Sequence, residues 1–297
     1  MPVSQKLDIP HDELNLDYTL TSGQAFRWKK MSDGWWRGVV SANILQIRQA
    51  EIGFEWETFP DSGNLGLLRD YFRLDDDIAA VYSQLAATDP HVAYLIERFR
   101  GLRMLRQDPV ETLLSFICSA ANSIPRISKG IEEMSRLYGE YIGEVDGVRY
   151  HAFPTLEALA AADDSQIWTA TRLGFRCPSL KNVALQLLER PEGWLYSLRD
   201  APYEDAKAEL LDIQGVGQKI ADCVCLFALD KNEAVPVDTH VRQLAVRLYM
   251  PEITTRSITT SVYNRIGDFF RSKFDGYAGW AQQFLYYEDV LRSRGEL

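Results

Sequence analysis

A chain of 297 residues is long enough for one large domain or for two to three smaller ones. Its apolar fraction of 46% and charged fraction of 25% are those of an ordinary soluble protein, and neither a signal peptide nor a membrane-spanning run is visible, so we expect a cytosolic protein that is not secreted. The net charge of −10 argues against nucleic-acid binding through a broad basic surface, but it allows binding through backbone amides, helix N-termini and a few local cations.

Aromatic and β-branched side chains dominate the chain from about residue 13 to residue 60. Turn signals divide this part into expected strands over residues 24–30, 34–40 and 43–49. From about Asn64 onward, apolar periodicity predicts helices over 64–72, 75–87, 109–121, 179–189, 218–229, 239–249 and 278–293.

The change from strands to helices predicts an α+β protein with a domain boundary near residue 107. Residues 1–107 are expected to form a small antiparallel β domain with helices, and residues 108–297 a mostly α-helical domain. The cysteines Cys118, Cys177, Cys223 and Cys225 are spaced too irregularly for a disulfide framework or a metal site, so we expect reduced thiols and no catalytic metal.

The segment LLDIQGVGQKIADC, residues 210–223, predicts a helix, a tight hairpin and a second helix. Gly215 and Gly217 flank one apolar residue and allow a turn that most side chains could not follow. The free amides from these glycines to Gln218 and beyond would bind a phosphate oxygen without reading a base. On the hairpin alone, a plain helix–helix corner explains the glycines equally well.

Lys219 lies at the start of the second helix, where the helix dipole and partial burial disfavour the ammonium form and favour a nucleophilic amine. Asp238 begins the helix predicted over 239–249. Taken singly, a surface lysine, a capping aspartate and a structural His240 are the more frequent roles for these residues. Together, an amine and a carboxylate facing one cleft would suit attack on an oxocarbenium-like carbon.

The stretch GVGQKIADCVCLFALDKNEAVPVDTH, with SGQAFRW, DDD, QDPVETLLSFICS, LGFR and GWAQQFLYY in the same order, resembles the helix–hairpin–helix DNA glycosylases, and within them the 8-oxoguanine DNA glycosylases. The likeness runs from about residue 13 to residue 294. It implies a bifunctional enzyme of base excision repair, which flips 8-oxoguanine out of duplex DNA, excises it through a lysine Schiff base and cleaves the strand by β-elimination. It also implies a monomer whose helical domain has two lobes around the active-site cleft, located in the cytoplasm or nucleoid of a bacterium or the nucleus of a eukaryote.

The resemblance assigns roles to individual residues. Lys219 would attack the sugar C1′, and Asp238 would stabilise the sugar cation. Cys223 and Tyr286 would lie on the two faces of the base, and Gln282 would hydrogen-bond to its Watson–Crick edge.

Three further residues belong to the same pattern. The carbonyl of Gly23 would accept the N7–H that distinguishes 8-oxoguanine from guanine, whose N7 lone pair it would repel. His240 would bind a DNA phosphate, and Asp289 would orient the histidine.

The segment expected to read the opposite cytosine departs from the family pattern. Arg126 and Arg176 match the two arginines of the family, and Phe175 replaces its tyrosine wedge. Ala121 stands where the family has an asparagine. Unless Asn122 substitutes, we expect weaker discrimination among opposite bases, by roughly 1–3 kcal/mol.

No cofactor is expected to be required. The family suggests a loosely bound structural cation at the hairpin carbonyls of Leu211, Ile213 and Val216. The chain lacks the four-cysteine loop with which related glycosylases bind an iron–sulfur cluster.

Two alternative functions stay open on the sequence. One is a protein that binds damaged DNA without catalysis, which the joint presence of Lys219, Asp238, Gln282 and Gly23 disfavours. The other is a monofunctional glycosylase for alkylated purines, which Lys219 disfavours.

Overall fold

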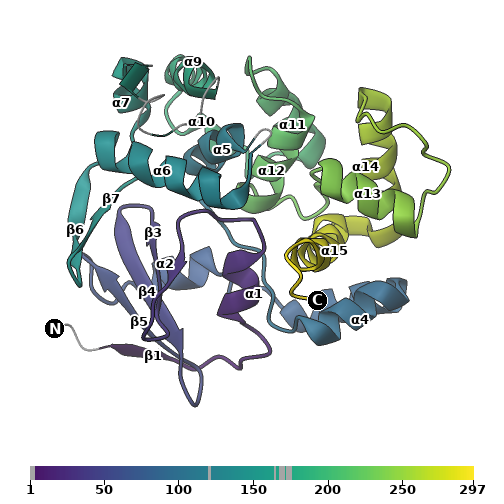
Figure 1. The fold of residues 1–297 in the computed structure, drawn as a ribbon, viewed down its shortest axis with the longest axis horizontal. Coiled ribbons are helices and arrows are strands. Elements are labelled where there is room, and N and C mark those ends of the chain that lie inside the picture. The colour runs from purple at the N-terminus through teal and green to yellow at the C-terminus, as the bar shows by residue number, and fades with distance from the viewer. Residues whose placement is uncertain (1–3, 120–121, 164, 167–170, 172–175) are drawn as a thin grey trace.

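The computed structural model describes residues 4–119, 122–163, 165–166, 171 and 176–297, with the side chains of residues 176 and 177 outside that description. The first part of the chain forms a five-stranded antiparallel sheet in the order β1-β5-β4-β3-β2 (Figure 1). Its strands are β1 (Gln5–Leu7), β2 (Lys29–Lys30), β3 (Trp36–Val40), β4 (Asn43–Gln49) and β5 (Phe54–Phe59).

The central strands β3 and β4 form where they are predicted, with Trp36 opposite Ile47 and Val39 opposite Ile44. In contrast, only the last two residues of the expected strand 24–30 pair with a neighbour. The buried side chain of Gln24 explains this difference. Its Nε2 donates to the backbone carbonyl of Arg103 at 2.8 Å, and its Oε1 accepts the backbone amide of Leu105 at 2.8 Å. These bonds take residue 24 away from the sheet.

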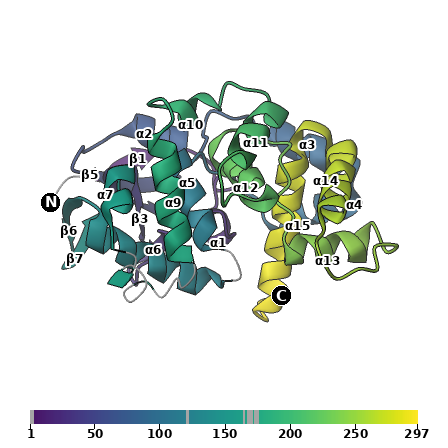
Figure 2. The ribbon, with the colours of Figure 1, turned by 90° about the horizontal axis from the view of Figure 1, so that it is seen from above.

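Helices make up most of the remaining chain (Figures 1 and 2). Those flanking the sheet or leading from it are α1 (Leu16–Thr21), α2 (Leu65–Tyr71), α3 (Ile78–Thr88) and α4 (Pro90–Arg98). Those that follow are α5 (Pro109–Cys118), α6 (Ile124–Tyr138), α7 (Leu156–Ala161), α9 (Arg176–Leu188), α10 (Trp194–Ser197), α11 (Tyr203–Leu211), α12 (Gln218–Ala228), α13 (Thr239–Leu248), α14 (Thr260–Phe274) and α15 (Ala278–Ser293). A short hairpin of β6 (Tyr141–Val145) and β7 (Val148–His151) interrupts the helices, and a single turn over Asp275–Tyr277 precedes α15.

Two clusters of buried side chains stabilise the molecule. The smaller one packs the sheet against α1 and α2 around Trp56 and Phe72. The larger one unites the later helices with α3 and α4, as in the edge-to-face contact of Tyr82 with Phe284 at 5.7 Å. The α+β architecture is as predicted, but the core does not divide at residue 107, because α3 and α4 pack on α14 and α15.

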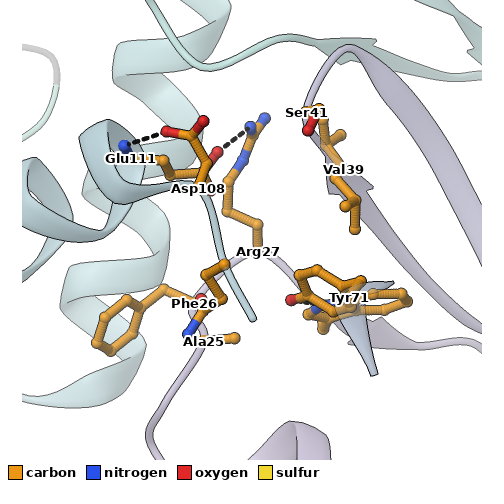
Figure 3. A pocket seen from close by; sticks show the side chains of 11 residues that line it. Ala25, Phe26, Arg27, Val39, Ser41, Tyr71, Asp108 and Glu111 are labelled. Atoms are coloured by element: carbon orange, nitrogen blue, oxygen red, sulfur yellow. Dashed lines mark hydrogen bonds and ion pairs between the residues drawn. The ribbon is translucent and has the colours of Figure 1, made fainter. Parts of the chain in front are cut away.

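The sheet domain and the helical domain meet at the start of α5, where Figure 3 shows Arg27 pointing toward Asp108 and Glu111. Asp108 caps α5 by accepting the amide of Glu111 at 2.8 Å, and a guanidinium nitrogen of Arg27 lies 3.6 Å from the carboxylate of Glu111. Burial beside a cavity of about 20 Å³ raises the pKa of Glu111 to about 7, although Arg27 opposes the shift. We therefore expect the stability of this joint to depend on pH.

In the part of the chain that the structure describes, no helix has the length and apolar character needed to cross a lipid bilayer.

Candidate active site

The hairpin between α11 and α12 leaves backbone amides available. Gly217 is the N-cap of α12 and provides no side-chain cap, and Gly215 adopts a φ of +104°. Because no side chain caps α12, the first amides of the helix are open to a bound anion. Gly217 and Gln218 line the large cleft described below, as the phosphate-binding hypothesis requires.

The other side of this hairpin is hydrogen-bonded to side chains of α9. The carbonyl of Gln214 accepts from the side-chain amides of Gln186 at 3.1 Å and Asn182 at 3.4 Å, and the amide of Gln214 donates back to Gln186 at 2.8 Å. The turn is thus fixed by side-chain hydrogen bonds as well as by its glycines.

Lys219, in the first turn of α12, is half-buried and directed across to the end of α5. Its Nζ donates to Ser119 Oγ at 3.0 Å and lies 4.7 Å from the centre of the Phe116 ring. Ser119 in turn donates to the carbonyl of Phe116 at 2.6 Å, so its oxygen is free to accept from the lysine. The amine is therefore positioned over an aromatic face by two residues of another helix.

Asp238 is placed for both roles that the sequence left open, the helix cap and the carboxylate facing the cleft. Its Oδ1 accepts the amide of Val241 at 2.9 Å and caps α13. Oδ2 has no hydrogen-bond partner among the described residues, and the side chain lines the same cavity as Lys219. One oxygen therefore stabilises the helix, while the other is available to a substrate.

A cavity of about 40 Å³ brings together the predicted catalytic and base-binding residues. It is lined by Lys219 and Asp238 together with Gly23, Cys223, Gln282 and Tyr286, and by Phe116, Phe227, Pro236, Val241 and Gln283. It adjoins a cleft of about 870 Å³, with which it shares Gly23, Phe116, Lys219, Asp238 and Tyr286. A macromolecular substrate in the cleft would reach the amine and the carboxylate together.

Gln282 presents an unsatisfied acceptor at this cavity. The residue is 4% exposed, and its Oε1 has no hydrogen-bond partner in the described part of the chain. A buried oxygen without a donor costs free energy, of the order of 1–3 kcal/mol, which a ligand with an N–H group would recover.

Cys223 and Tyr286 supply the apolar surfaces of the cavity. Burial raises the pKa of Cys223 to about 12, so the side chain is a neutral thiol and does not compete with the lysine as a nucleophile. Burial also raises the pKa of Tyr286, whose ring meets His240 edge to face at 5.8 Å.

Gly23 adopts a φ of +82°, and a Cβ at this position would lie 3.1 Å from Cε1 of Tyr286. The neighbouring carbonyl of Ser22 accepts from the buried side chain of Gln283 at 2.8 Å. The loop thus lies close against α15 without a side chain of its own at residue 23, which leaves its backbone accessible to a base.

His240 and Asp289 meet as predicted, with Nδ1 of the histidine 2.9 Å from the carboxylate. His240 lines the cleft, and Arg247 approaches the same carboxylate at 3.5 Å. The second ring nitrogen of His240 is thereby oriented by a fixed partner.

The residues expected to read the opposite base are only partly described. Ala121 and Phe175 lie outside the described residues, as does the side chain of Arg176. Arg126 is exposed on α6. Asn122 lines the cleft, but its amide group donates to the carbonyl of Cys118 at 3.3 Å and accepts from the amide of Ser123 at 3.0 Å.

The hairpin carbonyls of Leu211, Ile213 and Val216 follow one another along the turn. The carbonyl of Ile213 already accepts the amide of Val216 at 3.0 Å, so one lone pair of its oxygen remains for a cation. Carbonyl oxygens suit a hard cation, so this donor set fits the predicted kind of ion. Among the described residues, no group of three His, Cys, Asp or Glu side chains is arranged to bind a metal ion.

Sequence reasoning did not identify Ser119, Phe116 or Gln283 as part of the site. Ser119 and Phe116 lie within a helix that the sequence predicts, but their contact with Lys219 depends on how two helices pack. The one available signal for Gln283 is a second glutamine beside Gln282 in the otherwise apolar and aromatic first half of its helix.

Comparisons with known proteins agree with this geometry. A family model for the N-terminal domain of 8-oxoguanine DNA glycosylase matches residues 6–113, and one for HhH-GPD superfamily base excision DNA repair proteins matches residues 114–264. The chain is 35% identical over 293 residues to the N-glycosylase/DNA lyase OGG1 of Arabidopsis thaliana, across 96% of this chain and 80% of the relative. It is 33% identical over 330 residues to the N-glycosylase/DNA lyase of Saccharomyces cerevisiae, across 98% of this chain and 87% of the relative.

The fold is also that of a solved relative. The 8-oxoguanine glycosylase/lyase of Clostridium acetobutylicum, in complex with double-stranded DNA containing cytosine opposite 8-oxoguanine, has a TM-score of 0.83 and 30% identity to this chain. The match covers 95% of this chain and 93% of that one. The family models, the identity along nearly the whole chain and the shared fold establish that this protein belongs to the 8-oxoguanine DNA glycosylase family of helix–hairpin–helix base excision repair enzymes.

Proposed function

We propose that this protein excises 8-oxoguanine from duplex DNA, opposite cytosine, with Lys219 as the nucleophile, and then cleaves the strand at the resulting site. It is a DNA N-glycosylase with DNA lyase activity, and duplex DNA is its substrate. The location that follows from this substrate is the cytoplasm or nucleoid of a bacterium or the nucleus of a eukaryote.

The strongest support from the structure is the buried acceptor of Gln282 at the cavity. The Watson–Crick edge of 8-oxoguanine carries donors at N1 and at the exocyclic amine, so a flipped base would satisfy this oxygen. Guanine carries the same donors, and for this reason Gln282 selects a guanine-type base without recognising the oxidation.

Recognition of the oxidation falls to the backbone of Gly23. A carbonyl oxygen accepts the N7–H of 8-oxoguanine and repels the N7 lone pair of guanine. The positive φ and the close approach to Tyr286 disfavour any side chain at this position. Cys223 and Tyr286 would enclose the two faces of the base, and their contacts would offset part of the cost of flipping it, which is a few kcal/mol.

Lys219 and Asp238 then carry the chemistry. As the bond between C1′ and N9 breaks, the electron pair leaves with the base, and positive charge develops on the sugar. The free oxygen of Asp238 stabilises that charge, and the amine of Lys219 forms the new bond to C1′. Loss of a proton and ring opening give a Schiff base, from which removal of a C2′ proton expels the 3′ phosphate.

The remaining residues bind the DNA backbone and the opposite base. The open amides of Gly215, Gly217 and Gln218 would bind one phosphate, and His240, oriented by Asp289, another. A cation at the carbonyls of Leu211, Ile213 and Val216 would help to hold a phosphate against the hairpin and would take no part in the reaction.

The opposite cytosine would meet Arg126, Arg176 and the ring of Phe175. Asn122 already uses both ends of its amide within its own turn, so it is poorly placed to replace the asparagine missing at Ala121.

The test is a single-turnover assay on a duplex with one 8-oxoguanine opposite cytosine, in which free base and cleaved strand are both quantified. Wild-type protein should release the base and cleave the strand, and it should do neither on undamaged duplex. Lys219→Gln should lose both products, whereas Lys6→Gln, at an exposed position on β1, should retain both. Base release that persists in Lys219→Gln would contradict the proposal, and tight binding without any base release would favour a damage-binding protein.

A further inference from the structure

Helix α12 buries a carboxylate that the proposed reaction does not use. Asp222 is 0% exposed and lies between Lys219 and Cys223 on the same helix. It is not among the described residues that line the cavity or the cleft. A buried carboxylate is costly unless donors compensate it, so its partners indicate what it stabilises.

Three donors from two other helices converge on this carboxylate. Oδ1 accepts the hydroxyl of Tyr203 at 2.7 Å, and Oδ2 accepts Nζ of Lys207 at 2.9 Å, both from α11. Oδ2 also accepts the hydroxyl of Tyr263 from α14. Burial, with the charge of Asp222, raises the pKa of both tyrosines, so both hydroxyls keep their protons.

Tyr263 connects this carboxylate to the loop that carries Asp238. Because its one proton is donated to Asp222, a lone pair of its oxygen is left for the amide of Val237, which donates to it at 3.3 Å. The alternative acceptor for that proton, the carbonyl of Val235, is farther away at 3.4 Å. Val237 directly precedes Asp238, so one hydroxyl joins the helix of the nucleophile to the backbone of the catalytic carboxylate.

We propose that Tyr263, oriented by Asp222, is a positioning residue that sets the place of Asp238 relative to Lys219. This inference rests on the proposed function and deepens it. Lys219 and Asp222 lie one turn apart on a rigid helix, and the two bonds of Tyr263 extend that rigidity to the loop. The free oxygen of Asp238 is thereby held where charge develops on the sugar, and stabilisation of that charge falls steeply when the carboxylate is displaced.

Tyr203 provides a matched control within the same network. Its hydroxyl bonds to the same carboxylate, and Tyr203 and Tyr263 are each 5% exposed. Among the described residues, the other hydrogen bonds of the Tyr203 hydroxyl are with Lys207 at 3.0 Å and Arg271 at 3.2 Å, and none is with residues 235–238. Removal of either hydroxyl costs one bond to Asp222, but only Tyr263 reaches Val237.

The experiment compares Tyr263→Phe and Tyr203→Phe with wild type in three measurements. The first is the single-turnover rate of 8-oxoguanine release at saturating enzyme. The second is the dissociation constant for the lesion duplex, measured in a Lys219→Gln background so that no base is lost. The third is the free energy of unfolding in urea, which reports the loss that both variants share.

We expect Tyr263→Phe to lower the rate of base release by roughly three- to tenfold, with a dissociation constant within about twofold of wild type. Tyr203→Phe should lose a similar amount of stability and keep its rate within about twofold. Both variants should still form a borohydride-trapped adduct on a preformed abasic site, because Lys219 stays in place.

Equal rate losses in the two variants would overturn the inference, because they would show a general structural effect. An unchanged rate in Tyr263→Phe, or loss of its adduct on the abasic site, would overturn it as well. Wild-type protein that releases no base would instead refute the proposed function, and this inference with it.

Discussion

The two walls of the cleft are stabilised in different ways. The catalytic wall, residues 217–220 and 237–240, is tied to distant elements through Asp222, Tyr263 and the bonds from α9 to Gln214. The opposite wall, residues 119 and 122–127, has short-range hydrogen bonds in the described part of the chain, such as those of Asn122 with Cys118 and Ser123, apart from the bond that Ser119 accepts from Lys219.

This contrast suggests that the two walls serve different steps, bond cleavage and recognition of the opposite base. The geometry of bond cleavage depends on many long-range contacts and tolerates little change. The proposed recognition of the opposite base would depend on a few local side chains, whose exchange would leave the chemistry in place. In the sequence, the departure at Ala121 falls between residues 119 and 122 of the second wall.

The largest effect is expected on the catalytic wall, from Asp238→Asn. Asparagine caps a helix about as well as aspartate, so α13 and the stability of the protein should be nearly unchanged. Loss of the charge should lower single-turnover base release by about a hundredfold or more. Loss of activity accompanied by a large drop in the urea midpoint would instead assign Asp238 a mainly structural role.

Gly23→Ala tests the loop that lines both the small cavity and the large cleft. The added Cβ would lie 3.1 Å from Tyr286 at a φ of +82°, so the loop must shift. We expect the preference for lesion over undamaged duplex, measured as a ratio of dissociation constants, to fall about 5- to 150-fold, equivalent to roughly 1–3 kcal/mol. Gly34→Ala is the control, because it has a φ of +85° but no neighbour within 4 Å. An unchanged ratio in Gly23→Ala would remove the discriminating role from this backbone.

Glu111→Gln tests how α5, which leads into the opposite wall, is joined to the sheet. Glu111 has a pKa of about 7, raised from 4.5 by burial, so the folded protein binds this proton more tightly than the unfolded chain does. The resulting stabilisation is complete below about pH 4.5 and is lost as the pH rises to about 7. Wild-type protein should therefore lose about 1–3 kcal/mol more stability than Glu111→Gln between pH 5 and pH 8 in urea unfolding.

The exposed Glu51→Gln serves as the control for this comparison and should retain the pH dependence of wild type. Parallel curves for wild type and Glu111→Gln would show that Glu111 does not titrate in this range.

The smallest effect is expected for the opposite base. Wild-type protein should excise 8-oxoguanine opposite adenine or thymine more readily, relative to cytosine, than relatives with the asparagine do. Ala121→Asn should raise the preference for cytosine by about 1 kcal/mol, whereas Asn122→Ala should change it little, because the amide of Asn122 is engaged within its own turn. A wild-type preference equal to that of the relatives would refute this expectation.

Features encoded within one stretch of chain were predictable. The hairpin glycines, Lys219 and Asp238 lie within a single segment, and the helical periodicity around Gln282 is strong, so their elements form where the sequence places them. The strands β3 and β4 were predictable for the same reason, since the turn and the apolar pattern agree.

Features that depend on packing between distant segments were not predictable. The contact of Lys219 with Ser119 joins residues 100 positions apart, and the bond from Gln283 to Ser22 joins residues 261 apart. Helix α1 was not predicted, although Asn15 caps it by accepting the amide of Tyr18 at 3.0 Å, because the strand-like residues that follow outweigh this local signal. The hairpin of β6 and β7 is a separate omission, because its Asp146-Gly147 turn, with positive φ at both residues, is a local hairpin signal.

The most direct test of the central claim is borohydride trapping on a duplex with one 8-oxoguanine opposite cytosine, followed by mass mapping of the modified peptide. We expect a covalent adduct on the peptide that contains Lys219, present in wild type and in Lys6→Gln and absent from Lys219→Gln. An adduct on another residue, or efficient base release without any adduct, would contradict the assignment of Lys219 as the nucleophile.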